Sequence, residues 1–264
     1  MTVFMQGCNF NCQNCHNPET MGLCNHCGDC IPGCEPGALS FDFSGEIQWD
    51  SESCTHCDDC LKICPISASP KITEYTSQEL IEIIRGNVAF INGVTFSGGE
   101  TTLQSRFLAD FLHNLNNCDD LKHLDCMIDS NGFTTENNWQ KLLPYVSGVM
   151  VDLKSWSDDI HKKITGQSVQ PVLKTIMLLS KYNKLEEIRL LPIEGITDYD
   201  EHLDSIVSFI KNLPHETSIR LNAFTPHLSV KLNHPATTEA DIKFLANQLT
   251  ELGIYNLRLP AVYL

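Results

Sequence analysis

Hydrophobic and polar positions form short β-branched runs along most of the chain, and longer amphipathic stretches separate these runs. The runs predict strands at residues 92–97, 123–129, 148–154, 187–193, 218–224 and 254–259, and residues 2–6 predict one more at the start. Between them, stretches such as LQSRFLADFLHNL and TEADIKFLANQLTEL carry apolar residues at helical spacing. Thr76 with Glu79 and Thr238 with Asp241 form capping boxes, which predict that helices begin at these threonines.

The alternation of strands and helices predicts right-handed βαβ units and therefore a parallel sheet. We expect an α/β fold, a partial (β/α) TIM-like barrel of about six parallel strands. Residues 22–70 differ from the rest because they are rich in turns and cysteines and interrupt the first connection between strand and helix. Two domains are therefore expected: the barrel from residues 1–21 and 71–264, and an insert from residues 22–70.

Charge and hydropathy argue against several classes of function. The 264 residues include 18 basic and 33 acidic side chains, a formal net charge of −15, and such a surface repels the phosphates of nucleic acids. No apolar stretch approaches the roughly 20 residues that a membrane helix needs. The first residues, MTVFMQGC, have neither the basic region nor the apolar core of a secretory signal. We therefore expect a cytoplasmic protein with no nucleic-acid or membrane partner.

The 13 cysteines are concentrated near the amino terminus. Only Cys118 and Cys126, which we interpret as small buried apolar residues, lie outside the first quarter of the chain. Disulfides do not persist in a reducing cytosol, so cysteines at this density indicate metal binding. The candidate metal ligands are Cys8, Cys12, Cys15, Cys24, Cys27, Cys30, Cys34, Cys54, Cys57, Cys60 and Cys64.

The first group, Cys8, Cys12 and Cys15, has the spacing CxxxCxxC and directly follows the first predicted strand. Three thiolates on one short loop can hold three irons of a 4Fe–4S cube and leave the fourth iron without a protein ligand. Such an open coordination site is what a metal needs to bind and activate a substrate. A structural zinc site is the alternative, and His16 would then be its fourth ligand.

The remaining groups form a duplication, CNHCGDCIPGC and CTHCDDCLKIC, with thirty residues between equivalent positions. Each copy has the CxxCxxCxxxC spacing of bacterial ferredoxins, in which the fourth cysteine ligates the other cluster. Pro65 follows the second run directly, whereas Glu35 separates the first run from its proline. Each copy alone would also fit a zinc knuckle, but the pair favours two 4Fe–4S clusters that relay electrons. The expected ligand sets are Cys24, Cys27, Cys30 with Cys64, and Cys54, Cys57, Cys60 with Cys34.

Six unusual segments fall at the carboxyl ends of predicted strands: MQGC, TFSGGE, MIDSNG, MVDLK, IRLLPIEG and LNAFTPH. In a parallel barrel these ends converge on one face, and active sites lie on that face. The sequence therefore predicts one site built from several strand ends.

Taken together, CxxxCxxC followed by His16-Asn17-Pro18, the ferredoxin-like duplication and SGGE resemble the radical SAM activating enzymes of glycyl radical enzymes. The resemblance covers essentially the whole chain and is closest to the YjjW-type activases. It implies S-adenosyl-L-methionine (SAM) as cofactor, with three 4Fe–4S clusters, one of them SAM-binding on Cys8, Cys12 and Cys15. It also implies reductive cleavage of SAM to methionine and a 5′-deoxyadenosyl radical, which takes hydrogen from a backbone glycine of the partner enzyme. A flavodoxin or ferredoxin is the implied electron donor, and no side chain is expected to act as acid or base.

The resemblance also implies which residues contact SAM. Carried over position by position, these are Asn14, His16, Gly98, Gly99, Glu100, Asp129, Asn131, Asp152, Leu153, Lys154, Arg189 and His227. His227 lies two residues beyond the position where the family places a histidine, so an ordinary loop histidine remains the alternative. A bare turn at the glycine pair and a surface ion pair in DLK are the corresponding structural explanations.

Two other functions remain open at this point. A radical SAM enzyme could act on a small molecule or on another peptide residue, with the insert as an electron relay. An electron carrier could use the barrel only as a scaffold.

Overall fold

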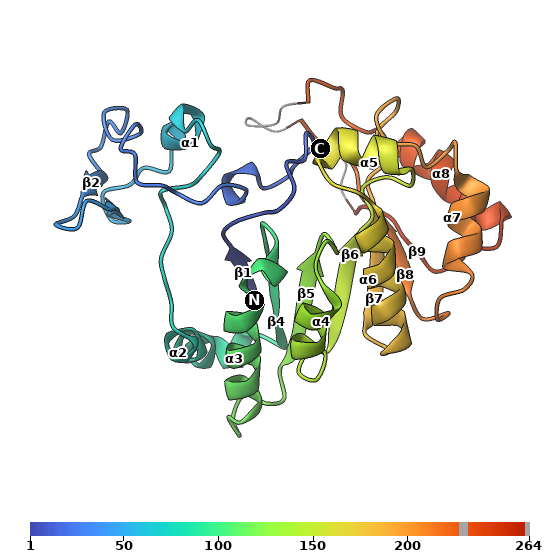
Figure 1. Cartoon of the computed structure of the whole chain (residues 1–264), viewed down its shortest axis with the longest axis horizontal. Helices are drawn as coiled ribbons and strands as arrows, with labels where there is room; N and C mark the ends of the chain where they lie inside the picture. Colours follow the sequence, from blue (N-terminus) through green and yellow to red (C-terminus); the bar gives the residue numbers. More distant parts are fainter. Residues whose placement is uncertain (227–231, 262–264) are drawn as a thin grey trace.

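A computed structural model describes residues 1–226 and 232–261, and its centre is a parallel sheet (Figure 1). In spatial order the sheet contains β1 (Thr2–Met5), β4 (Gly93–Gly98), β5 (Asp125–Ser130), β6 (Gly148–Asp152), β7 (Leu185–Leu190), β8 (Ser218–Leu221) and β9 (Leu257–Arg258). Every neighbouring pair is parallel, which confirms the predicted α/β class. The sheet has 7 strands where the sequence predicts about six in the barrel.

Helices connect the strands in chain order. They are α2 (Ser77–Asn87), α3 (Ser105–Asn116), α4 (Glu136–Leu142), α5 (Asp158–Thr165), α6 (Gln170–Lys181), α7 (Leu203–Ile210) and α8 (Glu239–Glu251), with short 3₁₀ turns η1 (Pro18–Thr20), η2 (Val88–Phe90) and η3 (Thr101–Gln104). Among the described residues, no helix combines the length and the apolar character needed to cross a lipid bilayer.

Alternation along the strands separates an apolar face of the sheet from a polar one. On β4 and β5, Phe96 and Ile128 are fully buried in the core that the helices cover. Their neighbours Ser97 and Asp129 point to the opposite face, because successive side chains of a strand alternate. The strands thus carry a hydrophobic core on one side and a row of polar groups on the other.

Both predicted capping boxes are present. The Thr76 hydroxyl accepts a hydrogen bond from the Glu79 amide, and the Thr76 amide donates to the Glu79 carboxylate at 2.8 Å. Thr238 and Asp241 make the same pair of bonds at the start of α8. Local chemistry therefore fixes where these two helices begin.

Residues 22–70 form no part of the large sheet. They contain a two-stranded antiparallel hairpin, β2 (Leu39–Phe41) with β3 (Ile47–Trp49), and the short helix α1 (Asp59–Ile63). At the base of the segment Gly22 bridges to Ala68, and the Gly22 amide donates to the Ser67 carbonyl at 3.2 Å. Figure 1 shows this segment, coloured from blue to teal, beside the sheet, with β2 on its outer side.

Replacing the cap of α2 should weaken the fold by a small, defined amount. Thr76→Ala removes the side-chain acceptor for the first turn, and we expect it to lower the free energy of unfolding by about 1 kcal/mol. Urea denaturation measures the change. Thr73→Ala, at an exposed position in the extended segment before the helix, is the matched control and should leave stability unchanged. Equal effects of the two substitutions would contradict the capping role.

Candidate active site

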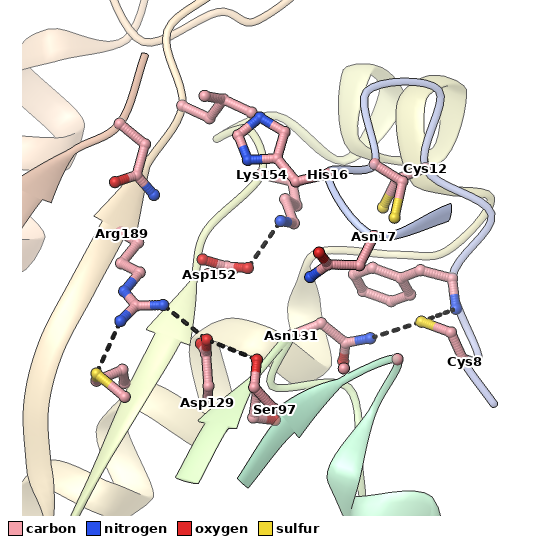
Figure 2. A pocket seen from close by; sticks show the side chains of 18 of the residues that line it. Cys8, Cys12, His16, Asn17, Ser97, Asp129, Asn131, Asp152, Lys154 and Arg189 are labelled. Carbon is pink, nitrogen blue, oxygen red and sulfur yellow. Dashed lines mark hydrogen bonds and ion pairs between the residues drawn. The ribbon is translucent and has the colours of Figure 1, made fainter. Parts of the chain in front are cut away.

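A cavity of about 570 Å³ opens at the carboxyl ends of the strands (Figure 2). Segments from β1, β4, β5, β6, β7 and β8 all contribute to its lining, as the strand-end motifs predict. The predicted site residues in this lining are Cys8, Cys12, Asn14, Cys15, His16, Gly98, Gly99, Asp129, Asn131, Asp152, Lys154 and Arg189.

The loop that carries the three cysteines is held from two sides. On one side, the amides of Asn11 and Gln13 donate to the last carbonyls of α5, those of Thr165 at 2.8 Å and Ile164 at 3.0 Å. On the other side, the Cys8 amide donates to the Met21 carbonyl at 2.9 Å. Because these bonds use backbone groups, they fix the path of the loop and leave the thiols facing the cavity.

Gly98 and Gly99 are required by the approach of another backbone segment. Gly98 has a φ of +111°, and a Cβ atom there would lie 2.3 Å from the Met5 carbonyl oxygen. A Cβ atom on Gly99 would lie 2.1 Å from the Gly7 carbonyl oxygen. The Gly99 amide stabilises this contact by donating a hydrogen bond to the Met5 carbonyl at 2.9 Å. These glycines therefore seat the end of β1 against the end of β4.

Glu100 lies behind the cavity wall rather than in it. Its fully buried carboxylate accepts bonds from the Thr102 amide (3.0 Å) and hydroxyl (2.6 Å), the Ser130 hydroxyl (2.9 Å) and the Asn131 amide (2.7 Å). Burial raises the pKa of Glu100, and these donors oppose that rise. The side chain thus ties the end of β4 to the end of β5 and sets the position of Asn131.

Leu153, another predicted contact, does not join the cavity lining. Leu153 is buried in the hydrophobic core, and its carbonyl accepts a bond from the Tyr199 hydroxyl at 2.6 Å. His227 lies outside the described residues.

Charged side chains of alternating sign face the cavity. Arg189 pairs with Asp129 at 2.8 Å and Lys154 pairs with Asp152 at 2.7 Å, as Figure 2 shows. Burial and the nearby Asp152 raise the pKa of Asp129. Burial also opposes ionisation of Asp152, but Lys154 and Arg189 outweigh it and lower the pKa of that carboxyl. Both carboxylates therefore depend on the two cations beside them.

Asn14 is the clearest sign that the cavity receives a polar ligand. The residue is 3% exposed and lines the cavity, and neither its side-chain amide nitrogen nor its amide oxygen has a hydrogen-bond partner. Leaving a buried amide unpaired costs about 1–3 kcal/mol. A group that enters the cavity with both a donor and an acceptor would satisfy it.

Several residues that line or support the cavity were not predicted. Ser97 donates to Asp129 at 3.1 Å, and Asn9 accepts a bond from Asn131 at 2.8 Å. Met150 and Asn222 also line the cavity. Two of these residues could have been predicted from the sequence. Met150 lies two residues before Asp152 and therefore on the same face of its strand, and Ser97 directly precedes the glycine pair.

Glu187, a buried residue of β7, holds one of the residues that line the cavity. Its carboxylate, 2% exposed, accepts bonds from Arg189 at 2.8 Å, Arg220 at 2.9 Å and the Ser218 hydroxyl at 3.2 Å. Burial opposes ionisation of Glu187, but the two arginines outweigh it and lower its pKa. Glu187 therefore restrains Arg189 through Nε, while Asp129 accepts from Nη1.

The cysteines of residues 22–70 surround two smaller cavities. Cys24, Cys27, Cys30 and Cys64 line one, and Cys34, Cys54, Cys57 and Cys60 line the other. Each cavity thus brings together one of the two ligand sets expected from the sequence. In the described part of the chain, no group of three or more His, Cys, Asp or Glu side chains is placed to hold a single metal ion.

Comparison with known proteins identifies the superfamily. The model of the radical SAM superfamily matches residues 2–210, so the chain belongs to this superfamily. The superfamily implies SAM and a 4Fe–4S cluster as cofactors.

The relatives are activating enzymes of glycyl radical enzymes, which confirms the resemblance found in the sequence motifs. The chain is 28% identical over 240 residues to the 4-hydroxyphenylacetate decarboxylase activating enzyme of Clostridium scatologenes, covering 83% of this chain and 76% of the relative. It is 32% identical over 231 residues to the trans-4-hydroxy-L-proline dehydratase activating enzyme of Clostridioides difficile, covering 80% and 74%.

Solved structures share the fold. A domain of the pyruvate-formate lyase-activating enzyme of Bacteroides vulgatus superposes with a TM-score of 0.53 at 22% identity, covering 64% of this chain and 99% of that domain. SuiB of Streptococcus suis, bound to its precursor peptide, gives a TM-score of 0.61 at 14% identity, covering 98% and 48%.

The Glu187 network predicts a specific pH dependence of stability. Because the pKa of Glu187 is lowered in the folded chain, the ionised carboxylate stabilises the fold above its ordinary value of 4.5 and loses this effect as the pH falls through the lowered pKa. Glu187→Gln should therefore reduce the free energy of unfolding near neutral pH, and its difference from the parent chain should shrink in acid. Urea unfolding at a series of pH values measures this. Glu186→Gln, at the exposed neighbour, is the control; parallel pH profiles for the two variants would refute the assignment.

Proposed function

We propose that this chain activates a partner glycyl radical enzyme by SAM-dependent removal of hydrogen from a backbone glycine. The observation that carries the proposal is the convergence of Cys8, Cys12 and Cys15 with two carboxylate–cation pairs on one cavity of a radical SAM fold. The two relatives described above are activating enzymes, which favours this reaction over the other chemistries of the superfamily.

The residues present fit the cofactors. The three cysteines would hold a 4Fe–4S cluster and leave one iron without a protein ligand. The unpaired side-chain amide of Asn14 would bind a polar group of the ligand in the same cavity. When bound, the cluster and SAM supply reductive cleavage of the sulfonium to methionine and a 5′-deoxyadenosyl radical. The protein contributes position and shielding from water, and no side chain needs to move a proton.

The charged pairs suit the polar ends of SAM. Carboxylates such as Asp129 and Asp152 can accept bonds from an ammonium or from ribose hydroxyls, and Lys154 and Arg189 can pair with a carboxylate. The Lys154 ammonium also lies near the cysteines, where it acts against the rise in thiol pKa caused by burial. It would thereby favour the thiolates that ligate iron.

Residues 22–70 would act as the electron supply, a ferredoxin-like domain with two further 4Fe–4S clusters. The two sets of four cysteines around separate cavities support this assignment. A reduced flavodoxin or ferredoxin would be the donor, and the glycine-bearing loop of the partner would enter the main cavity from its open side.

The central test is the formation of a protein radical. Reconstituted chain, SAM and reductant are mixed without oxygen with a candidate glycyl radical enzyme, and we expect a glycine-centred doublet in the EPR spectrum. Cys12→Ser should abolish the doublet by removing an iron ligand. Cys118→Ser, outside the cavity, is the matched control and should retain it. Deoxyadenosine formed with a modified small product, and no protein radical with any plausible partner, would instead support small-molecule chemistry.

A second test addresses SAM binding directly. Asp152→Asn removes a charged acceptor from the cavity, and a hydrogen bond to a charged group is worth about 1.5–3 kcal/mol. SAM should therefore bind about 10- to 100-fold more weakly to this variant. Asp159→Asn, at an exposed position on α5, should bind like the parent chain. Calorimetric titration of the anaerobic protein measures both, and unchanged affinity in Asp152→Asn would remove Asp152 from the binding site.

A further inference from the structure

The duplication in residues 22–70 extends to backbone conformation. His26 and His56, thirty residues apart, both adopt a φ of 56°. Two positions further on, Gly28 and Asp58 both have positive φ, at +86° and +61°. Left-handed φ is uncommon for residues other than glycine, so its repetition shows that the two halves follow the same local path.

The two halves differ in charge at two corresponding positions that contact each other within each half. In the first half the Phe41 ring covers Gly28, where a Cβ atom would lie 2.4 Å from the ring carbon Cζ. The same offset of thirty residues leads from Phe41 to Lys71 and from Gly28 to Asp58. In the second half these positions form an ion pair, with the Lys71 ammonium donating to the Asp58 carboxylate. An apolar contact in one half is thus an ion pair in the other.

The cation is the more buried member of this ion pair. Lys71 and Asp58 both line the cavity that contains Cys54 and Cys60, but the Lys71 side chain is 15% exposed whereas that of Asp58 is 48% exposed. Water screens the more exposed carboxylate better. Burial opposes ionisation of Lys71, but Asp58 outweighs it and raises the pKa of Lys71, so the side chain is a cation at neutral pH.

The other cavity has no such cation. Its lining, all of it within the described residues, contains no lysine or arginine. It includes the carboxylate-bearing Asp29 and the apolar residues Ile47, Ile66 and Ala68. The four cysteines that surround it are otherwise equivalent to those of the second cavity.

We propose that Lys71 raises the reduction potential of the cluster held by Cys34, Cys54, Cys57 and Cys60 above that of the cluster held by Cys24, Cys27, Cys30 and Cys64. The proposal rests on the proposed function, which assigns a 4Fe–4S cluster to each set. Reduction adds one electron and one negative charge to a cluster, and a nearby ammonium stabilises the added charge. An electron from a donor protein then resides preferentially on the Lys71 side of the insert.

The test is a redox titration of the full-length, anaerobically reconstituted protein, followed by EPR. Lys71→Met should lower the midpoint potential of one insert cluster, with about a tenfold fall in its reduced-to-oxidised ratio at fixed potential, or about 59 mV for one electron. Asp58→Asn should shift the same cluster in the opposite direction, because it leaves the ammonium unpaired. Lys71→Arg keeps the charge and should preserve the separation of the two potentials.

Lys62→Met is the matched control, because Lys62 pairs with Asp59 on the surface and does not line the cavity. It should leave both potentials unchanged. A double substitution, Cys54→Ala with Cys57→Ala, removes one signal and so identifies which cluster has shifted. If the ion pair acted only by holding the local structure, Lys71→Met and Asp58→Asn would shift the midpoint potential in the same direction. That result would overturn the proposal.

Iron analysis separates failure of this inference from failure of the proposed function. The parent chain should contain about 12 iron atoms, four for each of three clusters. A chain that binds only about four would contradict the clusters of the insert themselves. A chain with all three clusters and equal insert potentials, or with potentials that ignore Lys71, would refute the inference alone.

Discussion

The contact between the backbone ends of β1 and β4 is the constraint on which the site depends. Gly98 and Gly99 allow the two strand ends to meet at a separation that no side chain would permit. The cysteine loop continues directly from β1, so its position relative to the other strand ends is set at this junction. Glu100, the next residue, then carries the constraint across to β5 through its bond to the Asn131 amide. One short segment therefore aligns the cysteines, the cavity wall and the polar groups of the neighbouring strand.

The charged side chains of the main cavity are also held in place by their neighbours. The formal net charge is −15, yet the cations that face the main cavity are each held by a carboxylate inside it. Arg189 forms ion pairs with both Asp129 and Glu187, at 2.8 Å from each. A side chain restrained on both sides loses little further entropy when a ligand binds, which is the physical basis of preorganisation.

Much of this arrangement could be predicted from the sequence, because it follows from local patterns. The alternation of β-branched runs with amphipathic stretches led to the parallel sheet, and the strand-end motifs led to the face that carries the cavity. The link that Glu100 makes to β5 could not be predicted, since its partners Ser130 and Asn131 lie about thirty residues further along the chain and only folding brings them near. The predicted strand at residues 148–154 is too long, because Leu153 and Lys154 leave the sheet after Asp152. The contrast between Phe41 and Lys71 was present in the duplicated sequence, but its meaning required knowing that each contacts the corresponding position, Gly28 or Asp58, of its own half.

The bridge between Gly22 and Ala68 bears on the history and the assembly of the chain. Strands β1 and β4 are neighbours in the sheet although the whole cysteine-rich segment lies between them in sequence. Because the two ends of that segment meet at the bridge, adding or deleting it changes the entropy of closing the connection only slightly. Such a segment can be gained, lost or exchanged as a cassette during evolution without disturbing the architecture that it interrupts.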